Sequence, residues 1–165
     1  MIAGRYGYAD DAKVEAAGDR ARRRGYYLLG EFLLITDWKT GRSRSRVRRN
    51  SAAAVEDATK LALSTSDEEL RVGVLTVLHG VAMPTASVLL HLAHHDPYPI
   101  LDFRALWSLG VDHIPSTWTF PFWTTYVAEC RRLANAAGVA MRVLDRALWQ
   151  YSKEQQPTPG LIASG

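Results

Sequence analysis

The sequence predicts an all-α protein, a single compact helical domain with two helices joined by a glycine-bearing hairpin at its centre. Apolar residues recur at helical spacing along most of the chain, and glycine, proline and Ser/Thr breaks separate these segments. The one strand-like alternation, over residues 42–49, consists of arginine and serine apart from Val47 and has no evident partner strand. We expect the domain to cover residues 1–155 and to be followed by a flexible tail over 156–165.

The composition is that of an ordinary soluble globular protein, with 47% apolar and 22% charged residues. No apolar run is long enough to span a bilayer and no signal peptide begins the chain, so a cytoplasmic protein without a membrane partner is expected. The single cysteine, Cys130, excludes an internal disulfide framework. No phosphate-cradling glycine loop is present, and no cofactor is expected.

The positive charge is concentrated in one part of the chain. Residues 20–49 hold ten of the twenty Lys and Arg residues but only two acids, Glu31 and Asp37, so this segment carries +8 and the remainder −5. The densest part, residues 42–49, is expected to be a loop or a short frayed helix. Such a concentration can bind phosphates, because each neutralised phosphate releases counterions. A solvated helix face and an exposed loop are the alternative.

The first half of the chain is expected to hold an irregular arm and three helices. The arm covers residues 1–8. Asp10 or Asp11 can cap a helix to about Arg24, with acids leading and bases trailing as the helix dipole prefers. A second helix extends to about Trp38 and is broken by residues 40–41. A third, capped by Asn50 or Ser51, extends to about residue 63.

Residues 66–110 are expected to form the centre of the domain. Ser66 and Glu69 match a capping box that opens a helix through the apolar run 70–78. A tight turn over residues 79–82 follows, and residues 84–93 form a helix that is apolar nearly all round and therefore buried. Asp102 is placed to cap the next helix, which ends near residue 110.

The last third of the chain is expected to begin with a loop over residues 111–117 and to continue with two helices. Pro121 fits the first turn of a long helix that extends to residue 137, where Gly138 ends it. The final helix covers about residues 141–154.

Two stretches of the central region resemble a known superfamily. Residues 78–86, LHGVAMPTA, resemble the helix-hairpin-helix motif, and residues 98–102, YPILD, resemble the segment that delivers the catalytic aspartate in helix-hairpin-helix DNA glycosylases. The resemblance implies a DNA glycosylase-like fold and a role in base excision repair. It implies a hairpin that binds DNA through Gly80, Val81, Ala82, Met83 and Thr85, and Asp102 as the carboxylate that stabilises an oxocarbenium-like sugar and positions a water.

A closer resemblance covers most of the chain. Residues 38–39, Asn50, the hairpin, and residues 98–110 and 144–153 resemble a bacterial family of about this length that brings no known activity. The chain departs from the glycosylase pattern at four points. Ala82 replaces the second hairpin glycine, and Pro84 stands where lyase-type members carry a Schiff-base lysine. Cys130 is alone where some members bind an iron–sulfur cluster, and the helix expected over residues 102–110 is about a turn shorter than usual. Covalent amine chemistry is therefore not expected.

The candidate site residues each have an alternative interpretation. Asp102 is either the catalytic carboxylate or simply a helix cap. Among the aromatic residues at 118–126, Phe122 and Tyr126 lie on the helical apolar stripe and belong to the core, whereas Trp118 and Trp123 are candidates for a base pocket. His91 and His95 are one helical turn apart, but no accompanying acid completes a known zinc pattern, and no metal is assigned.

The sequence predicts a DNA-binding protein that also uses Arg42, Arg44, Arg46, Arg48 and Arg49 for phosphate contacts. Its expected activity is that of a monofunctional DNA N-glycosylase that uses Asp102 and water. A non-catalytic nucleic-acid- or protein-binding domain on the same scaffold is the main alternative. A structural or toxin-associated partner protein is a third, and the oligomeric state is left open.

Overall fold

The computed structural model of the chain describes residues 2–7, 10–111, 113 and 115–157. Within these ranges the fold is all-α and has no strands, as expected. The elements, in order, are η1 (Ile2–Arg5), α1 (Asp11–Arg24), α2 (Leu29–Lys39), η2 (Gly41–Ser43), α3 (Arg44–Val47), α4 (Ala52–Ser64), α5 (Glu68–Thr76), α6 (Met83–Ala93), α7 (Phe103–Ser108), α8 (Phe120–Ala137) and α9 (Met141–Gln155). None of the described helices is long and apolar enough to span a bilayer.

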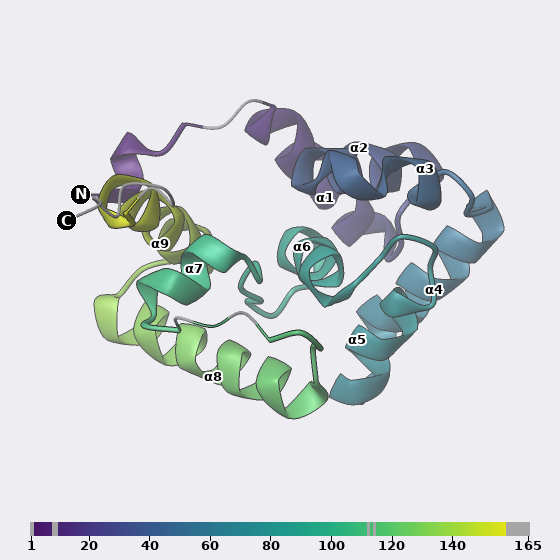
Figure 1. The fold of residues 1–165 in the computed structure, drawn as a ribbon. Coiled ribbons are helices and arrows are strands. Elements are labelled where there is room, and N and C mark those ends of the chain that lie inside the picture. The colour runs from purple at the N-terminus through teal and green to yellow at the C-terminus, as the bar shows by residue number, and fades with distance from the viewer. Residues whose placement is uncertain (1, 8–9, 112, 114, 158–165) are drawn as a thin grey trace.

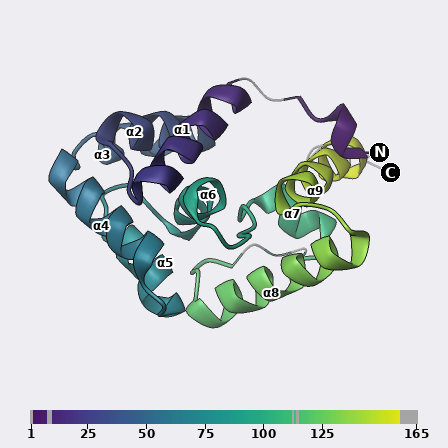
Figure 2. The ribbon, with the colours of Figure 1, turned by 180° about the vertical axis from the view of Figure 1, so that it is seen from behind.

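Helix α6 lies in the middle of the molecule, and the other helices surround it in both views (Figures 1 and 2). Every α6 residue except Pro84 and His91 is buried, which confirms the expectation from its apolar sequence. Helix α1 approaches it closely at Gly18, where an added Cβ would lie 2.6 Å from Leu92 Cβ. The Tyr27 hydroxyl donates to the Leu89 carbonyl at 2.8 Å. These contacts fix α6 as the central element of the core.

The glycine hairpin expected between the two central helices is present. Gly80 has φ +76°, and the Val81 amide closes the turn on the Leu78 carbonyl at 3.1 Å. The buried Asn50 side chain makes two hydrogen bonds to the backbone of the turn. Its Oδ1 accepts from the His79 amide at 2.8 Å, and its Nδ2 donates to the His79 carbonyl at 3.0 Å. The turn is therefore held by a residue 29 positions before His79 in the chain.

The arginine-rich segment packs directly behind this turn. Asn50 Nδ2 also donates to the Val47 carbonyl at 2.8 Å. A Cβ added at Gly80 would lie 2.9 Å from the Val47 amide nitrogen, so only glycine allows this approach. Residues 41–47 form the short helices η2 and α3, which agrees with the expected short frayed helix.

Two local expectations are wrong. The cap of α5 is Asp67, whose Oδ1 accepts from the Leu70 amide at 2.8 Å, because the helix begins one residue later than the Ser66 pattern implied. The N-terminal arm is not irregular throughout, since η1 is a 3-10 helix that packs on α9 and is anchored by the Arg5–Glu154 ion pair. The expected tail lies mostly outside the described residues.

Replacing Gly80 by alanine is expected to lower the free energy of unfolding by at least about 2 kcal/mol, because strained positive φ and overpacking each cost on the order of 1–3 kcal/mol. Urea denaturation measures this. Gly73→Ala is the matched control: Gly73 lies in α5, is exposed, and has no heavy atom within 4 Å of an added Cβ. It should stabilise the protein by roughly 0.5–1 kcal/mol. Equal changes in the free energy of unfolding for Gly80→Ala and Gly73→Ala would contradict the close contact of Gly80 with Val47.

Candidate active site

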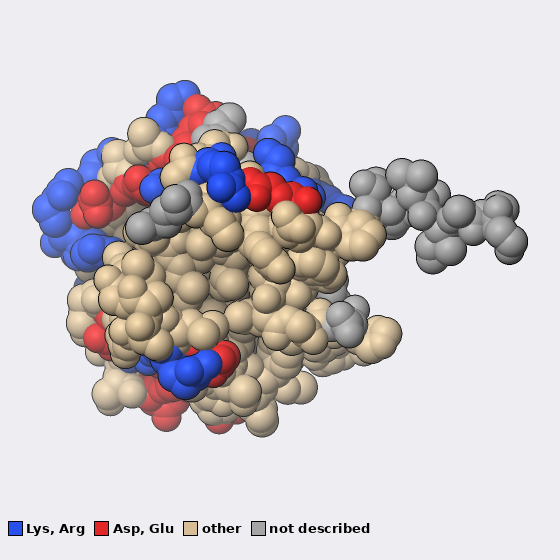
Figure 3. All heavy atoms as spheres, turned by 90° about the vertical axis from the view of Figure 1, so that its left-hand side faces the viewer, with Lys and Arg blue, Asp and Glu red and all other residues tan. Residues whose placement is uncertain are grey.

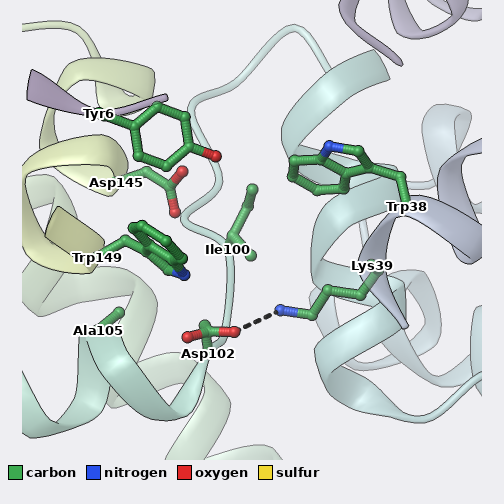
Figure 4. A pocket seen from close by; sticks show the side chains of 8 residues that line it. All are labelled: Tyr6, Trp38, Lys39, Ile100, Asp102, Ala105, Asp145 and Trp149. Carbon is green, nitrogen blue, oxygen red and sulfur yellow. Dashed lines mark hydrogen bonds and ion pairs between the residues drawn. The ribbon is translucent and has the colours of Figure 1, made fainter. Parts of the chain in front are cut away.

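Asp102 lies at a cavity that four distant parts of the chain build together. The cavity measures about 50 Å³ and is lined by Tyr6, Trp38, Lys39, Ile100, Asp102, Ala105, Asp145 and Trp149. Figure 4 shows Tyr6, Asp145 and Trp149 on one side, Trp38 and Lys39 on the other, and the Lys39–Asp102 contact bridging the two sides. Three of the stretches on which the expected closer resemblance rests, residues 38–39, 98–110 and 144–153, contribute to this cavity, whereas Asn50 and the hairpin do not line it.

The two oxygens of Asp102 have different partners. Oδ1 caps α7 by accepting from the Arg104 amide at 2.9 Å. Oδ2 faces the Lys39 ammonium at 3.2 Å, and Lys39 Nζ also donates to the Leu101 carbonyl at 3.0 Å. The Asp102 side chain is 21% exposed and that of Lys39 11%. Asp102 is therefore a helix cap and a cavity residue at once, because each role uses a different oxygen.

Lys39 is the main residue that sequence reasoning missed. In the glycosylase pattern the amine lies in the hairpin, where this chain has Pro84. The structure brings an amine to Asp102 from the end of α2 instead. No local pattern in the sequence points to Lys39 beyond the expected resemblance at residues 38–39.

A second carboxylate, Asp145 on α9, lines the same cavity. It is buried and paired with Arg142 at 2.6 Å. Burial raises the pKa of Asp145 to about 6, although the positive charge of Arg142 opposes the shift. Arg142 is held in turn by Asp11 at 2.6 Å and Glu15 at 3.0 Å, both on α1. The cavity thus contains two carboxylates in different surroundings, one beside a lysine and one buried beside an arginine.

Charged residues on the α7–α9 side of the molecule lie mainly along its edges. In Figure 3 the Lys and Arg side chains of this face lie next to Asp and Glu, and uncharged side chains cover its middle. The ion pairs between α9 and α1 agree with this picture. The middle of this face therefore carries no basic patch.

The aromatic walls of the cavity come from Tyr6, Trp38 and Trp149, which the sequence analysis did not select. The rings of Tyr6 and Trp149 meet edge to face at 5.3 Å between centroids. Trp123, a base-pocket candidate, is fully buried and stacks on Tyr98 at 5.9 Å, and its Nε1 donates to Glu68 at 3.0 Å. Trp123 is thus a core residue in this structure, away from Asp102. The spacing of residues along the helix did not distinguish a core position from a pocket position for Trp123.

A larger groove lies on another side of the Lys39–Asp102 pair. It measures about 420 Å³ and is lined by Lys39, Thr40, Arg42, Pro84, Thr85, Leu101, Asp102, Phe103 and Trp118. The groove joins the first turn of α6 to Asp102 and to the start of the arginine-rich segment. The structure therefore places Asp102 and the half-buried Trp118, two of the predicted residues, beside the hairpin's second helix.

The hairpin offers fewer backbone donors than the sequence suggested. The Val81 amide is used within the turn, the Thr85 amide donates to the Ala82 carbonyl at 2.9 Å, and Pro84 has no N–H. Within the described part of the chain, no acceptor is bonded to the amides of Gly80, Ala82 or Met83. These three amides are therefore the backbone donors that remain at the start of α6.

The arginines of residues 42–49 are all exposed but differ in their pairing. Asp37 pairs with Arg44 at 3.3 Å and with Arg48 at 2.8 Å. No acid of the described residues pairs with Arg42, Arg46 or Arg49; these three are thus the least neutralised cations near the hairpin.

His94, His95 and Asp96 lie close enough for a shared cation, with ligand atoms within 4.8 Å of one another. Both His94 nitrogens are occupied, however: Nε2 contacts Arg71 Nη1 at 2.6 Å, and Nδ1 accepts from the Asp96 amide at 3.0 Å. Burial and the adjacent Arg71 lower the pKa of His94 to about 4. His91 contacts the Tyr98 carbonyl at 2.6 Å through Nδ1. We assign no metal to these residues.

Comparison of the chain with models of protein families, with curated proteins and with solved structures finds no match in any of the three.

The raised pKa of Asp145 predicts a specific pH dependence of stability. The folded protein holds this proton more tightly than the unfolded chain, so its contribution is full below about pH 4 and is lost as the pH rises through 6. Wild type should lose up to about 3 kcal/mol relative to Asp145→Asn between pH 4 and 7. Urea denaturation of both proteins across this range measures the difference, which isolates Asp145 from the other carboxylates. If the difference in unfolding free energy between the two proteins stayed constant from pH 4 to 7, the pKa of Asp145 would not be raised.

Proposed function

We propose that the protein binds DNA through the hairpin and the arginine-rich segment, and that it hydrolyses the N-glycosidic bond of an extruded nucleotide with Asp102 and water. One observation carries this proposal: Asp102 lines an open groove beside the start of α6 while its second oxygen is free of the capping bond. A carboxylate in this position can stabilise positive charge that develops on a sugar.

The DNA-binding part rests on the junction between α3 and the hairpin. Asn50 and the close approach at Gly80 hold the basic segment against the turn. The backbone that carries Arg42, Arg46 and Arg49 is thus held next to the backbone amides of the turn. Such an arrangement contacts phosphates without reading sequence, so the proposed binding is electrostatic and non-specific.

The chemical step needs few groups. Water attacks C1′ of the sugar, and the C1′–N bond breaks with its electron pair leaving on the base. The water's proton passes to the Asp102 carboxylate and then to solvent, and the base takes up a proton from solvent. Lys39 keeps Asp102 in place and offsets its charge when no substrate is bound. The reaction is then a hydrolysis with no covalent protein–DNA intermediate.

A non-catalytic DNA-binding domain is the second candidate, and the Lys39–Asp102 ion pair favours it. The ammonium already neutralises the carboxylate that would have to face a developing positive charge. In this alternative the pair only joins α2 to the start of α7.

The arginines predict the salt dependence of binding. Replacing Arg42, Arg46 and Arg49 by alanine should reduce the slope of log K against log salt by about 3, since each phosphate contact contributes about 0.9. Fluorescence anisotropy with a labelled duplex measures the slope. Arg132→Ala is the control, because Arg132 is exposed on α8, on the opposite side of the molecule from α3 (Figure 1). Equal slopes for all three proteins would remove the segment from the interface.

Asp102→Asn should abolish base release from damaged duplexes, with a loss of at least about 100-fold, because electrostatic stabilisation of this kind contributes on the order of 10²–10³. Asparagine keeps an oxygen for the α7 cap, so DNA affinity should change little, whereas the melting temperature should fall because the largely buried Lys39 ammonium loses its counter-charge. Release assays on a panel of modified duplexes provide the measurement. No release by wild type, together with unchanged binding, would leave the non-catalytic alternative.

Borohydride treatment during the reaction should trap no covalent adduct, because water is the proposed nucleophile. The structure makes this a stringent test, since the Lys39 amine is 3.2 Å from Asp102. Lys39→Arg is the matched variant, which keeps the charge and removes the reactive amine. An adduct formed by wild type and lost in Lys39→Arg would replace the water route with a covalent one.

A further inference from the structure

Helices α4 and α5 lie side by side at the edge of the molecule opposite α9 (Figures 1 and 2). An open groove follows the two helices. Its apolar lining consists of Ala54, Ala58, Leu61, Val74, Val77 and Leu78. The groove shares no lining residue with either hollow at Asp102, so it is a separate feature of the surface.

The apolar side chains of α4 and α5 are exposed to an unusual degree. Six large apolar side chains of the described residues are 40% or more exposed, and three of the six, Leu61, Leu70 and Val77, belong to α4, to α5 and to the C-cap of α5. Val77 is 78% exposed, the highest value of the six. Single exposed apolar residues are normal, but a cluster of them beside a groove is typical of a surface that another protein covers.

Two exposed charges of opposite sign line the same groove. Arg49 precedes α4 and Asp57 lies within it. Across the part of the chain that the structure describes, neither side chain forms an ion pair, and the two do not pair with each other. Ala54, which also lines the groove, lies between them along the chain, so apolar surface separates the two charges. Such a surface is complementary to a copy of itself that is rotated by half a turn, because each charge then meets its opposite.

We propose that this surface, the α4–α5 face, binds a second copy of the chain across a two-fold axis. In a two-fold contact both copies use the same surface, so Arg49 of each copy faces Asp57 of the other. The axis passes between the two charges, where Val77 and Ala54 meet the same residues of the second copy. Apolar side chains leave water at the centre, and two ion pairs form at the rim.

This self-association is weak and does not depend on the proposed DNA-binding function. The rim ion pairs are accessible to solvent and contribute little, so the apolar centre supplies most of the affinity. Two helices from each copy make a small contact, and we expect a dissociation constant on the order of 10 µM. In more dilute solution the copies are separate, and Arg49 is then available for the phosphate contacts proposed above.

Sedimentation equilibrium of the full chain without DNA, at concentrations that span this value, measures the self-association. Val77→Gln should raise the dissociation constant by at least about tenfold, because an apolar side chain is lost from the centre in both copies. The high exposure of Val77 means that the fold of the single copy should not change, which circular dichroism checks. Tyr151→Gln is the matched control: Tyr151 is 42% exposed and lies on α9, on the opposite side of the molecule, so its replacement should leave the dissociation constant unchanged.

Charge reversal tests the two-fold arrangement itself. Arg49→Glu places two acids opposite each other in a dimer, and Asp57→Arg places two arginines opposite each other, so each variant alone should be monomeric at a concentration where wild type is dimeric. An equimolar mixture of the two variants restores both contacts, because each copy supplies the charge that the other has lost. Native mass spectrometry should therefore detect the mixed dimer, which differs in mass from either variant paired with itself. A purely structural role of Arg49 or Asp57 would not produce this rescue.

Three results would overturn the proposal. A wild-type protein that stays monomeric well above the expected dissociation constant would exclude self-association through this face. A dimer that persists in Val77→Gln, or that is weakened as much by Tyr151→Gln, would place the contact elsewhere on the molecule. Two charge-reversed variants that fail to form a mixed dimer would exclude the two-fold pairing of Arg49 with Asp57. None of these measurements includes DNA, so their failure would leave the proposed function untested, and a protein that binds no duplex could still form the dimer.

Discussion

The site depends on hydrogen bonds between buried α6 and residues 98–101, the extended segment that follows it. The Leu101 amide donates to Ser87 Oγ at 2.8 Å, and His91 Nδ1 contacts the Tyr98 carbonyl at 2.6 Å. Tyr126 on α8 donates to the Ile100 carbonyl at 2.7 Å. A buried segment without its own helix must find such partners, because unpaired backbone groups are costly. These bonds fix the position of Asp102, the next residue along the chain, relative to the hairpin.

Polar contacts at the α9 end of the molecule hold the other half of the site. Arg142 and Arg146 join α9 to Asp11 and Glu15 on α1, and Arg142 also neutralises Asp145. Removing one member of such a network would leave a buried charge without a partner, which usually costs more than the pair contributes. The ends of the chain are thereby connected: α9 holds η1, and η1 places Tyr6 at the cavity. The cavity consequently depends on contacts between residues more than 100 positions apart.

The sequence predicted the features that local rules determine. Helix α6 follows from its apolar run and Pro84, the α7 cap follows from Asp102, and the hairpin follows from Gly80, because each depends on residues within a few positions. The cavity did not follow, since Lys39, Asp145 and Trp149 meet only through tertiary packing. The aromatic run at 118–126 misled for the same reason: spacing shows which residues share a helix face, but not whether that face meets the core or a groove. Trp123 lies in the core, and Trp118 lies at the groove.

The stability of the fold does not by itself account for the Lys39–Asp102 ion pair. A helix cap needs one carboxylate oxygen, and Oδ1 fulfils that role. Holding a lysine that is only 11% exposed against the second oxygen requires partial desolvation of both charges, and apolar residues of similar size often stabilise such positions at least as well. Lys39 also donates to the Leu101 carbonyl, so its ammonium orders the backbone immediately before Asp102. The pair therefore orders the backbone that leads into Asp102 and at the same time joins the end of α2 to the start of α7.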